Sequence, residues 1–194
     1  TLSSSSAASD VYKRQGTLSL ERHRLLWLYL KNETSFFNKK NKILHIAPEQ
    51  CFYSSFKKYF NDYYTADINS PLADYKVDIC KMPFENNSFD FILCNHVLEH
   101  VYDDDLAIQE LLRVLKVKGT AVLQVPIDFK INKTIDGRDI KNPNKRNELF
   151  GQYDHLRIYG KDFFKKVEKH GFKVNKVKYC DNLDDNKIKK FGLA

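Results

Sequence analysis

Residues 89–126 constrain the fold of this 194-residue chain more than any other stretch. They open with a nearly continuous apolar run at 89–94, as expected for a strand covered on both faces of a parallel sheet. Three acidic residues at 103–105 favour a helix N-terminus, where carboxylates cap free N–H groups. Apolar residues at helical spacing follow, and a second apolar strand spans 119–125. Strand, helix and strand within about forty residues predict a right-handed βαβ unit.

The remaining segments alternate between strand and helix patterns. Residues 1–16 lack apolar periodicity and are interpreted as a disordered leader or an artefact, and residues 17–42 as a helical extension. We expect strands at 43–46, 63–66, 76–79 and 172–179, and helices at 50–60 and 161–170. This order predicts an α/β class: a doubly wound, mostly parallel sheet of about six strands with helices on both faces. Residues 43–194 are predicted to form this domain.

The composition and the charge distribution indicate where the protein is located and which partners it can have. No run of eighteen apolar residues and no secretory signal pattern occurs, and the four cysteines lack paired metal-ligand spacing. A cytoplasmic protein with reduced thiols is therefore expected. The positive charge lies in residues 127–194, with 17 basic against 10 acidic side chains. Because no aromatic-interleaved basic motif occurs there, we interpret this as a solvated surface and expect no nucleic-acid partner.

Four polar residues fall at or just past the carboxyl ends of successive predicted strands. They are Glu49, Asp67, Asp78 and Asn95. In an open parallel sheet these ends share one edge, so the four side chains are predicted to converge on one crevice. Asp67 lies about twenty residues after the end of the first strand, where an acid can accept hydrogen bonds from ribose hydroxyls.

Several blocks of the chain resemble the class I S-adenosylmethionine-dependent methyltransferases. The resemblance extends over residues 43–179, and its matching pieces are LHIAPE, TADIN, VDICKMPFENNSFDFILCNHVLEHV and ELLRVLKVKGTAVLQVP. This resemblance implies a Rossmann-like methyltransferase fold, S-adenosyl-L-methionine as the cofactor and a small-molecule methyl acceptor. Because the family normally ends with a seventh strand, the resemblance also implies that this strand is truncated at the C-terminus of this sequence. It also implies that Asp67 holds the ribose, with Ile68 beside it. Asp78 and Ile79 are expected to flank the adenine.

The loop after the first strand departs from the family pattern. His45 stands where the family has an acid, and Ala47, Glu49 and Cys51 replace glycines that let backbone approach a ligand. By resemblance, His45, Ala47 and Glu49 still belong to the cofactor site. Asn95 is expected to face the methionine part of the cofactor.

The predicted reaction is an in-line displacement of a methyl group from a sulfonium. The protein then contributes mainly alignment and a partly dehydrated site. A hydroxyl acceptor would also need a general base, and we predict His155, in the segment GQYDHLRIYG, for that role. Tyr153 and Arg157 from the same segment, together with His96, are expected on the substrate side. Asp154 and His155 could instead cap the following helix.

Two other functions remain open at this point. The altered loop could mark a catalytically degenerate, nucleoside-binding or regulatory module on the same fold. A more distant alternative is a zinc peptidase, because His96, Glu99 and His100 spell H-x-x-E-H. These three residues could also hold a divalent ion, but we interpret Glu99 and His100 as holding the turn in place and assign no metal ligand.

Overall fold

The computed structural model describes residues 19–193, so the predicted leader, residues 1–16, lies outside the described part of the chain. The described residues form two compact units. The sheet unit comprises residues 42–48 and 62–174, and the helical unit comprises residues 19–41, 49–61 and 175–193. The domain division proposed at residue 42 stays a prediction.

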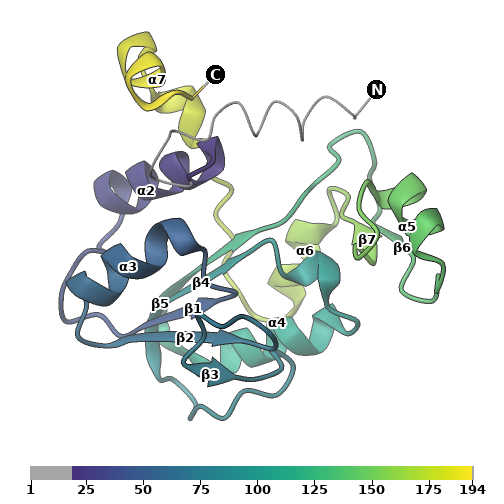
Figure 1. Ribbon diagram of the computed structural model, residues 1–194, viewed down its shortest axis with the longest axis horizontal. Coiled ribbons are helices and arrows are strands. Elements are labelled where there is room, and N and C mark those ends of the chain that lie inside the picture. The colour runs from purple at the N-terminus through teal and green to yellow at the C-terminus, as the bar shows by residue number, and fades with distance from the viewer. Residues whose placement is uncertain (1–18, 194) are drawn as a thin grey trace. The chain divides into compact units, whose positions relative to one another are not determined.

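A five-stranded parallel sheet with strand order β3-β2-β1-β4-β5 forms the centre of the sheet unit (Figure 1). Its strands are β1 Ile43–Ile46, β2 Tyr63–Asp67, β3 Tyr75–Lys76, β4 Phe89–Asn95 and β5 Leu115–Gln124. All side chains of β1 and six of the seven in β4 are buried, as their apolar runs predict. The strand order reverses between β1 and β4, and the carboxyl ends of such strands flank the place where open parallel sheets bind ligands.

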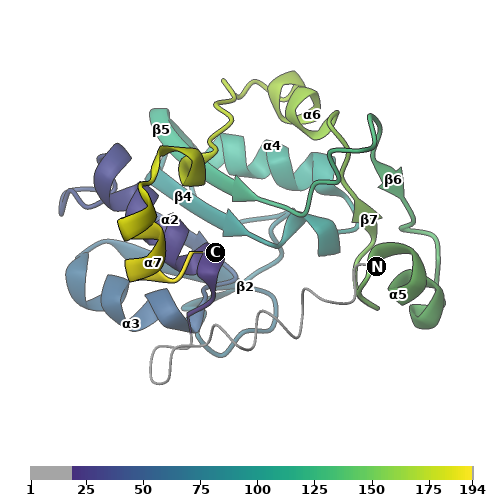
Figure 2. The ribbon, with the colours of Figure 1, turned by 90° about the horizontal axis from the view of Figure 1, so that it is seen from above.

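Helix α4, Asp104–Val114, links β4 to β5 through a short 3-10 helix, η1 Leu98–His100. Its N-cap is Asp103, whose Oδ1 accepts a hydrogen bond from the backbone N–H of Leu106 at 3.0 Å. Apolar residues of α4 and of α6, Phe163–Lys169, share one core cluster with the sheet. Figure 2 shows α6 beside α4. The predicted βαβ unit and the α/β fold class are confirmed.

Residues 128–158 contain structure for which the sequence analysis predicts no helix or strand. A two-stranded antiparallel ribbon pairs β6, Ile135–Asp136, with β7, Arg157–Ile158. Between these strands lies α5, Pro143–Phe150, whose N-cap is Asn142 and which ends at Gly151 in the left-handed region with φ 78°. Proline in the first helical turn and glycine after the last are ordinary helix boundary signals. This helix was therefore detectable from the sequence.

The helical unit contains α2 Glu21–Glu33, α3 Gln50–Tyr59, η2 Tyr179–Asn182 and α7 Asp185–Phe191. Aromatic rings hold α2 against α3, since the ring of Trp27 stacks on that of Phe56 with centroids 5.5 Å apart. The guanidinium of Arg24 donates to the backbone carbonyl oxygens of Phe191 and Gly192 at the end of α7. No helix among residues 19–193 is long and apolar enough to cross a membrane.

The prediction of a sixth sheet strand at 172–179 is wrong. The segment is irregular up to the start of η2, although Phe172 and Val174 pack on the core of the sheet unit. The alternation in this segment therefore reflects packing of single side chains without strand pairing. The predicted third strand at 76–79 is shorter and begins earlier, as β3 covers only Tyr75–Lys76.

Candidate functional site

A cavity of about 780 Å³ opens at the carboxyl ends of β1, β2 and β4. All its walls belong to the sheet unit. Five predicted cofactor residues line it: Ala47, Asp67, Ile68, Asp78 and Ile79. Its volume falls within the range of about 300–1,000 Å³ that is typical of small-molecule sites. The sheet edge thus provides a concave site where the sequence predicts one.

The loop after β1 has the backbone geometry of a glycine position. Ala47 lies in the left-handed region with φ 50°, and its N–H donates to the carbonyl oxygen of Ala66 at 2.9 Å. Non-glycine residues adopt this conformation only at a cost, because Cβ approaches the carbonyl oxygen. The methyl group of alanine is the smallest side chain that carries this cost. The loop therefore keeps a tight turn beside the cavity without its glycines.

Asp67, the last residue of β2, combines a structural contact with a free acceptor. Its Oδ1 accepts hydrogen bonds from the backbone N–H groups of Asn69 and Ser70, both at 2.6 Å. Its second oxygen, Oδ2, accepts no hydrogen bond from the described residues. Asp78 also accepts a backbone hydrogen bond, at Oδ1 from the N–H of Cys80 at 2.8 Å. Both carboxylates thus cap turns and line the cavity.

Three predicted cofactor residues do not line this cavity. His45 is fully buried in the middle of β1, with Nδ1 2.8 Å from the hydroxyl of Tyr63. Asn95 is 4% exposed at the end of β4. Glu49 belongs to the helical unit, where it is the N-cap residue of α3. Their roles toward a cofactor stay predictions.

The predicted substrate-side residues have very different environments. His96 lines the cavity in the left-handed region with φ 53°, and its Nδ1 lies 3.2 Å from Oε1 of Glu99. Tyr153 is 67% exposed. Arg157 is 1% exposed and donates hydrogen bonds to the backbone carbonyl oxygens around η1. The hydrogen bonds of Arg157 are therefore made within the protein. Contacts of His96, Tyr153 and Arg157 with a substrate stay predictions.

A buried charge network lies behind η1. The carboxylate of Asp104, which is fully buried, accepts hydrogen bonds from the hydroxyl of Tyr159 at 2.9 Å and from Nζ of Lys166 at 2.8 Å. Burial and the neighbouring carboxylate of Asp104 raise the pKa of Tyr159 well above its usual value, so the hydroxyl remains a donor. This network fixes the start of α4 and with it one wall of the cavity.

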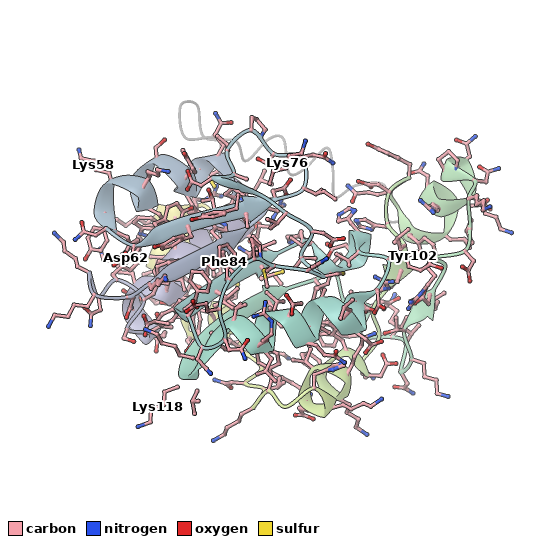
Figure 3. All side chains as sticks on the ribbon, turned by 90° about the horizontal axis from the view of Figure 1, so that it is seen from below. Lys58, Asp62, Lys76, Phe84, Tyr102 and Lys118 are labelled. Carbon is pink, nitrogen blue, oxygen red and sulfur yellow. The ribbon has the colours of Figure 1, made fainter. Side chains whose placement is uncertain are left out.

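Residues outside the prediction also line the cavity, namely His100, Tyr102, Asp103 and Asp154. Tyr102, labelled in Figure 3, donates from its hydroxyl to Oδ1 of Asp139 at 3.3 Å, and the guanidinium of Arg138 lies over its ring. The D-D-D run after LEHV was the available signal for this wall. From the sequence alone this run predicts only a helix cap.

The predicted base, His155, does not line the cavity but contacts His100, which does. The two imidazole centroids are 4.8 Å apart, and His155 is 8% exposed. Burial, followed by the neighbouring His100, lowers the pKa of His155 below its usual value. The ring is therefore neutral at pH 7. The alternative in which Asp154 and His155 cap the following helix is not seen, because the N-cap of α6 is Asp162.

The zinc-peptidase interpretation needs both histidines of H-x-x-E-H on one α-helix face. The structure has only the three-residue helix η1 here, and His96 lies before it in the left-handed region. The helical spacing on which that alternative depends is therefore absent from this segment.

Comparison with known proteins agrees with this architecture. Residues 49–123 match the family described as a methyltransferase domain. A Bacillus halodurans protein assigned as a methyltransferase has a TM-score of 0.56 at 18% identity, over 86% of this chain and 80% of its own. The [4+2]-cyclase SpnF has a TM-score of 0.61 at 16% identity, over 80% of this chain and 59% of its own.

A third structure is phosphoethanolamine N-methyltransferase 2 of Haemonchus contortus, in complex with S-adenosylhomocysteine. It has a TM-score of 0.53 at 17% identity, over 78% of this chain and 37% of its own. No curated protein sequence matches the chain.

The fold is thus the Rossmann-like α/β fold of the class I methyltransferases. Residues 49–123 are similar to a methyltransferase domain, and this similarity agrees with the resemblance stated from the sequence.

Proposed function

We propose that this protein is an S-adenosyl-L-methionine-dependent methyltransferase that transfers a methyl group to a small-molecule acceptor. The observation that carries the proposal is the cavity at the β1/β4 switch point, which Asp67 and the left-handed Ala47 line together in a chain whose residues 49–123 are similar to a methyltransferase domain. A cytoplasmic location remains part of the proposal. SpnF, a cyclase with this fold, is a reminder that fold alone does not define a reaction.

The residues of the cavity fit the proposed cofactor. Oδ2 of Asp67 is available to accept hydrogen bonds from the two ribose hydroxyls. The tight turn at Ala47 lets backbone approach the ligand, and Ile79, at 7% exposure, offers an apolar surface to an adenine ring. His96 and Asn95 at the end of β4 are proposed to face the reacting end. The cofactor, when bound, supplies an activated methyl group on a positively charged sulfur.

The protein needs to contribute alignment more than chemistry. A sulfonium already carries a good leaving group, so holding donor and acceptor in line and excluding water lower the barrier. Proton removal is required only for a hydroxyl acceptor. His155 is neutral as a base must be, but it would have to act through His100, because only His100 of the pair lines the cavity.

Calorimetric titration with S-adenosylmethionine tests the proposal directly. We expect the wild-type protein to bind, and the Asp67→Asn variant to bind about tenfold or more weakly. Asparagine keeps an acceptor oxygen for Asn69 and Ser70 but removes the charged acceptor for ribose, which is worth about 1.5–3 kcal/mol. Lack of binding by the folded wild-type protein would overturn the proposal in favour of the degenerate module.

A further inference from the structure

Three potential metal ligands meet beside the cavity, although they are far apart in sequence. Glu99 and His100 come from η1, and His155 comes from the segment before β7. One ligand atom from each side chain lies within 4.8 Å of the others. Glu99 is fully buried and His155 is 8% exposed, whereas His100 also lines the cavity. The cluster therefore lies between the core of the sheet unit and its cavity.

Hydrogen bonds fix which ring nitrogen each histidine leaves available. Nδ1 of His155 lies 3.2 Å from the carbonyl oxygen of Phe150, and Nδ1 of His100 lies 3.3 Å from that of Asp154. A carbonyl oxygen only accepts, so both Nδ1 atoms carry the hydrogen and both Nε2 atoms keep a lone pair. Oδ2 of Asp154, 3.4 Å from Nδ1 of His100, reinforces this tautomer. Metal-binding histidines are oriented in this way, by a carbonyl or carboxylate on the second nitrogen.

The carboxylate of Glu99 provides a second, independent observation that points to a cation ligand. Its Oε1 lies 3.2 Å from Nδ1 of His96, but its Oε2 is buried and has no hydrogen-bond partner in residues 19–193. No lysine or arginine of the described residues forms an ion pair with this carboxylate. A buried carboxylate oxygen without a partner is costly, and a bound cation would compensate it.

We propose that Glu99, His100 and His155 form a binding site for one divalent transition-metal ion. Two imidazole nitrogens and one carboxylate oxygen suit Zn²⁺, Fe²⁺ or Co²⁺, whereas Mg²⁺ and Ca²⁺ prefer oxygen ligands alone. Ligands of a tetrahedral ion lie about 3.4 Å apart, so binding draws the three donors together by side-chain rotation. Three protein ligands leave further coordination positions for water or another ligand.

This site differs from the H-x-x-E-H pattern of the sequence. His155, 56 positions after Glu99, takes the place that the pattern gives to His96. An ion bound here would occupy the Nε2 lone pair of His155. As a metal ligand, His155 would have no lone pair left for the general-base role that the sequence predicts.

The test uses the full chain, freed of metal with a chelator and titrated with Co²⁺ alone while the visible absorption is recorded. We expect one equivalent to bind, with d–d bands and without a thiolate charge-transfer band. Mg²⁺ at the same concentration should not compete. Because the readout is metal binding, it is independent of whether S-adenosylmethionine binds.

Three variants locate the site. We expect His100→Gln and Glu99→Gln each to weaken Co²⁺ binding at least tenfold, while the control His170→Gln, which removes a histidine paired with Asp105, binds as the wild type does. His100 is one-third exposed, so its replacement leaves the core intact and keeps the test valid if Glu99→Gln fails to fold. Absent binding, thiolate bands from the four cysteines, or equal affinity in the His100 variant would overturn the proposal.

Discussion

Arg157 donates a hydrogen bond from Nη1 to the backbone carbonyl oxygen of Leu98 at 2.7 Å, and both residues are buried. The same guanidinium also donates to the carbonyl oxygens of Val101 and Tyr102. One side chain of β7 therefore holds the turn that carries Glu99 and His100. Hydrogen bonds between β7 and the distant η1 turn thus determine the shape of the cavity wall.

Replacing Arg157 tests how much this contact stabilises the fold. We expect Arg157→Met to lower the free energy of unfolding by about 2–4 kcal/mol, because buried carbonyl oxygens lose their donors. The control is Arg138→Met, whose guanidinium is 29% exposed and which should cost about 1 kcal/mol or less. Denaturant titration measures both values. Equal losses in the two variants would contradict the account.

The left-handed backbone at Ala47 makes a second prediction. Ala47→Gly relieves a conformational cost of about 1–2 kcal/mol. The greater entropy of glycine in the unfolded chain offsets about 0.4–1 kcal/mol of that gain. The variant should therefore be as stable as the wild type or more so, and it should retain S-adenosylmethionine binding.

The matched control for Ala47 is Ala66→Gly within β2. Ala66 is fully buried and lies in a strand, so glycine there should only destabilise. Thermal unfolding and cofactor titration of both variants provide the comparison. A less stable Ala47→Gly protein would show that this loop is not strained.

We expect acid to destabilise the ribbon that β6 and β7 form, because Asp136 in β6 becomes protonated. Partial burial alone would raise the pKa of this carboxyl, but hydrogen bonds from Arg138 and the charge of Arg157 outweigh it and lower the pKa from 3.8 to about 2. A carboxyl group whose pKa is lower in the folded state stabilises the protein fully at pH values above its ordinary pKa of 3.8. This stabilisation is lost as the pH falls toward 2. We therefore expect unfolding temperature to fall in this acid range.

The Asp136→Asn variant isolates that contribution. It should be less stable than the wild type at neutral pH, and its unfolding temperature should fall less steeply between pH 4 and pH 2. Scanning calorimetry across this range measures both slopes. Parallel slopes would mean that other carboxylates, such as Asp105 beside Lys166 and His170, account for the acid sensitivity.

Local patterns predicted most of the sheet unit. The apolar run of β4, the cap at Asp103 and the polar residue at the end of β2 are features of short stretches, and each lies where the sequence indicates. The prediction of a sixth strand was wrong because it also depended on a local pattern alone. Alternation at 172–179 is a local pattern, but strand formation also needs a neighbouring strand to pair with.

Features that depend on distant segments were not predictable from the sequence. Nothing near Arg157 in the sequence indicates that it is fully buried against η1, because it donates its hydrogen bonds to backbone carbonyl oxygens, which leave no side-chain pattern. In the same way, His155 meets Glu99 only through the fold. The position of Asp67 beside the cavity was predictable, because the carboxyl end of a parallel strand places its last side chain at the edge of the sheet where ligands bind.

The central claim is that the cavity beside Asp67 holds the nucleoside of the methyl donor. A crystal structure with S-adenosylhomocysteine tests it most directly. We predict that both ribose hydroxyls lie within hydrogen-bonding distance of Oδ2 of Asp67 and that the adenine lies against Ile79. A nucleoside bound elsewhere, with Asp67 contacting only its own turn, would contradict the account.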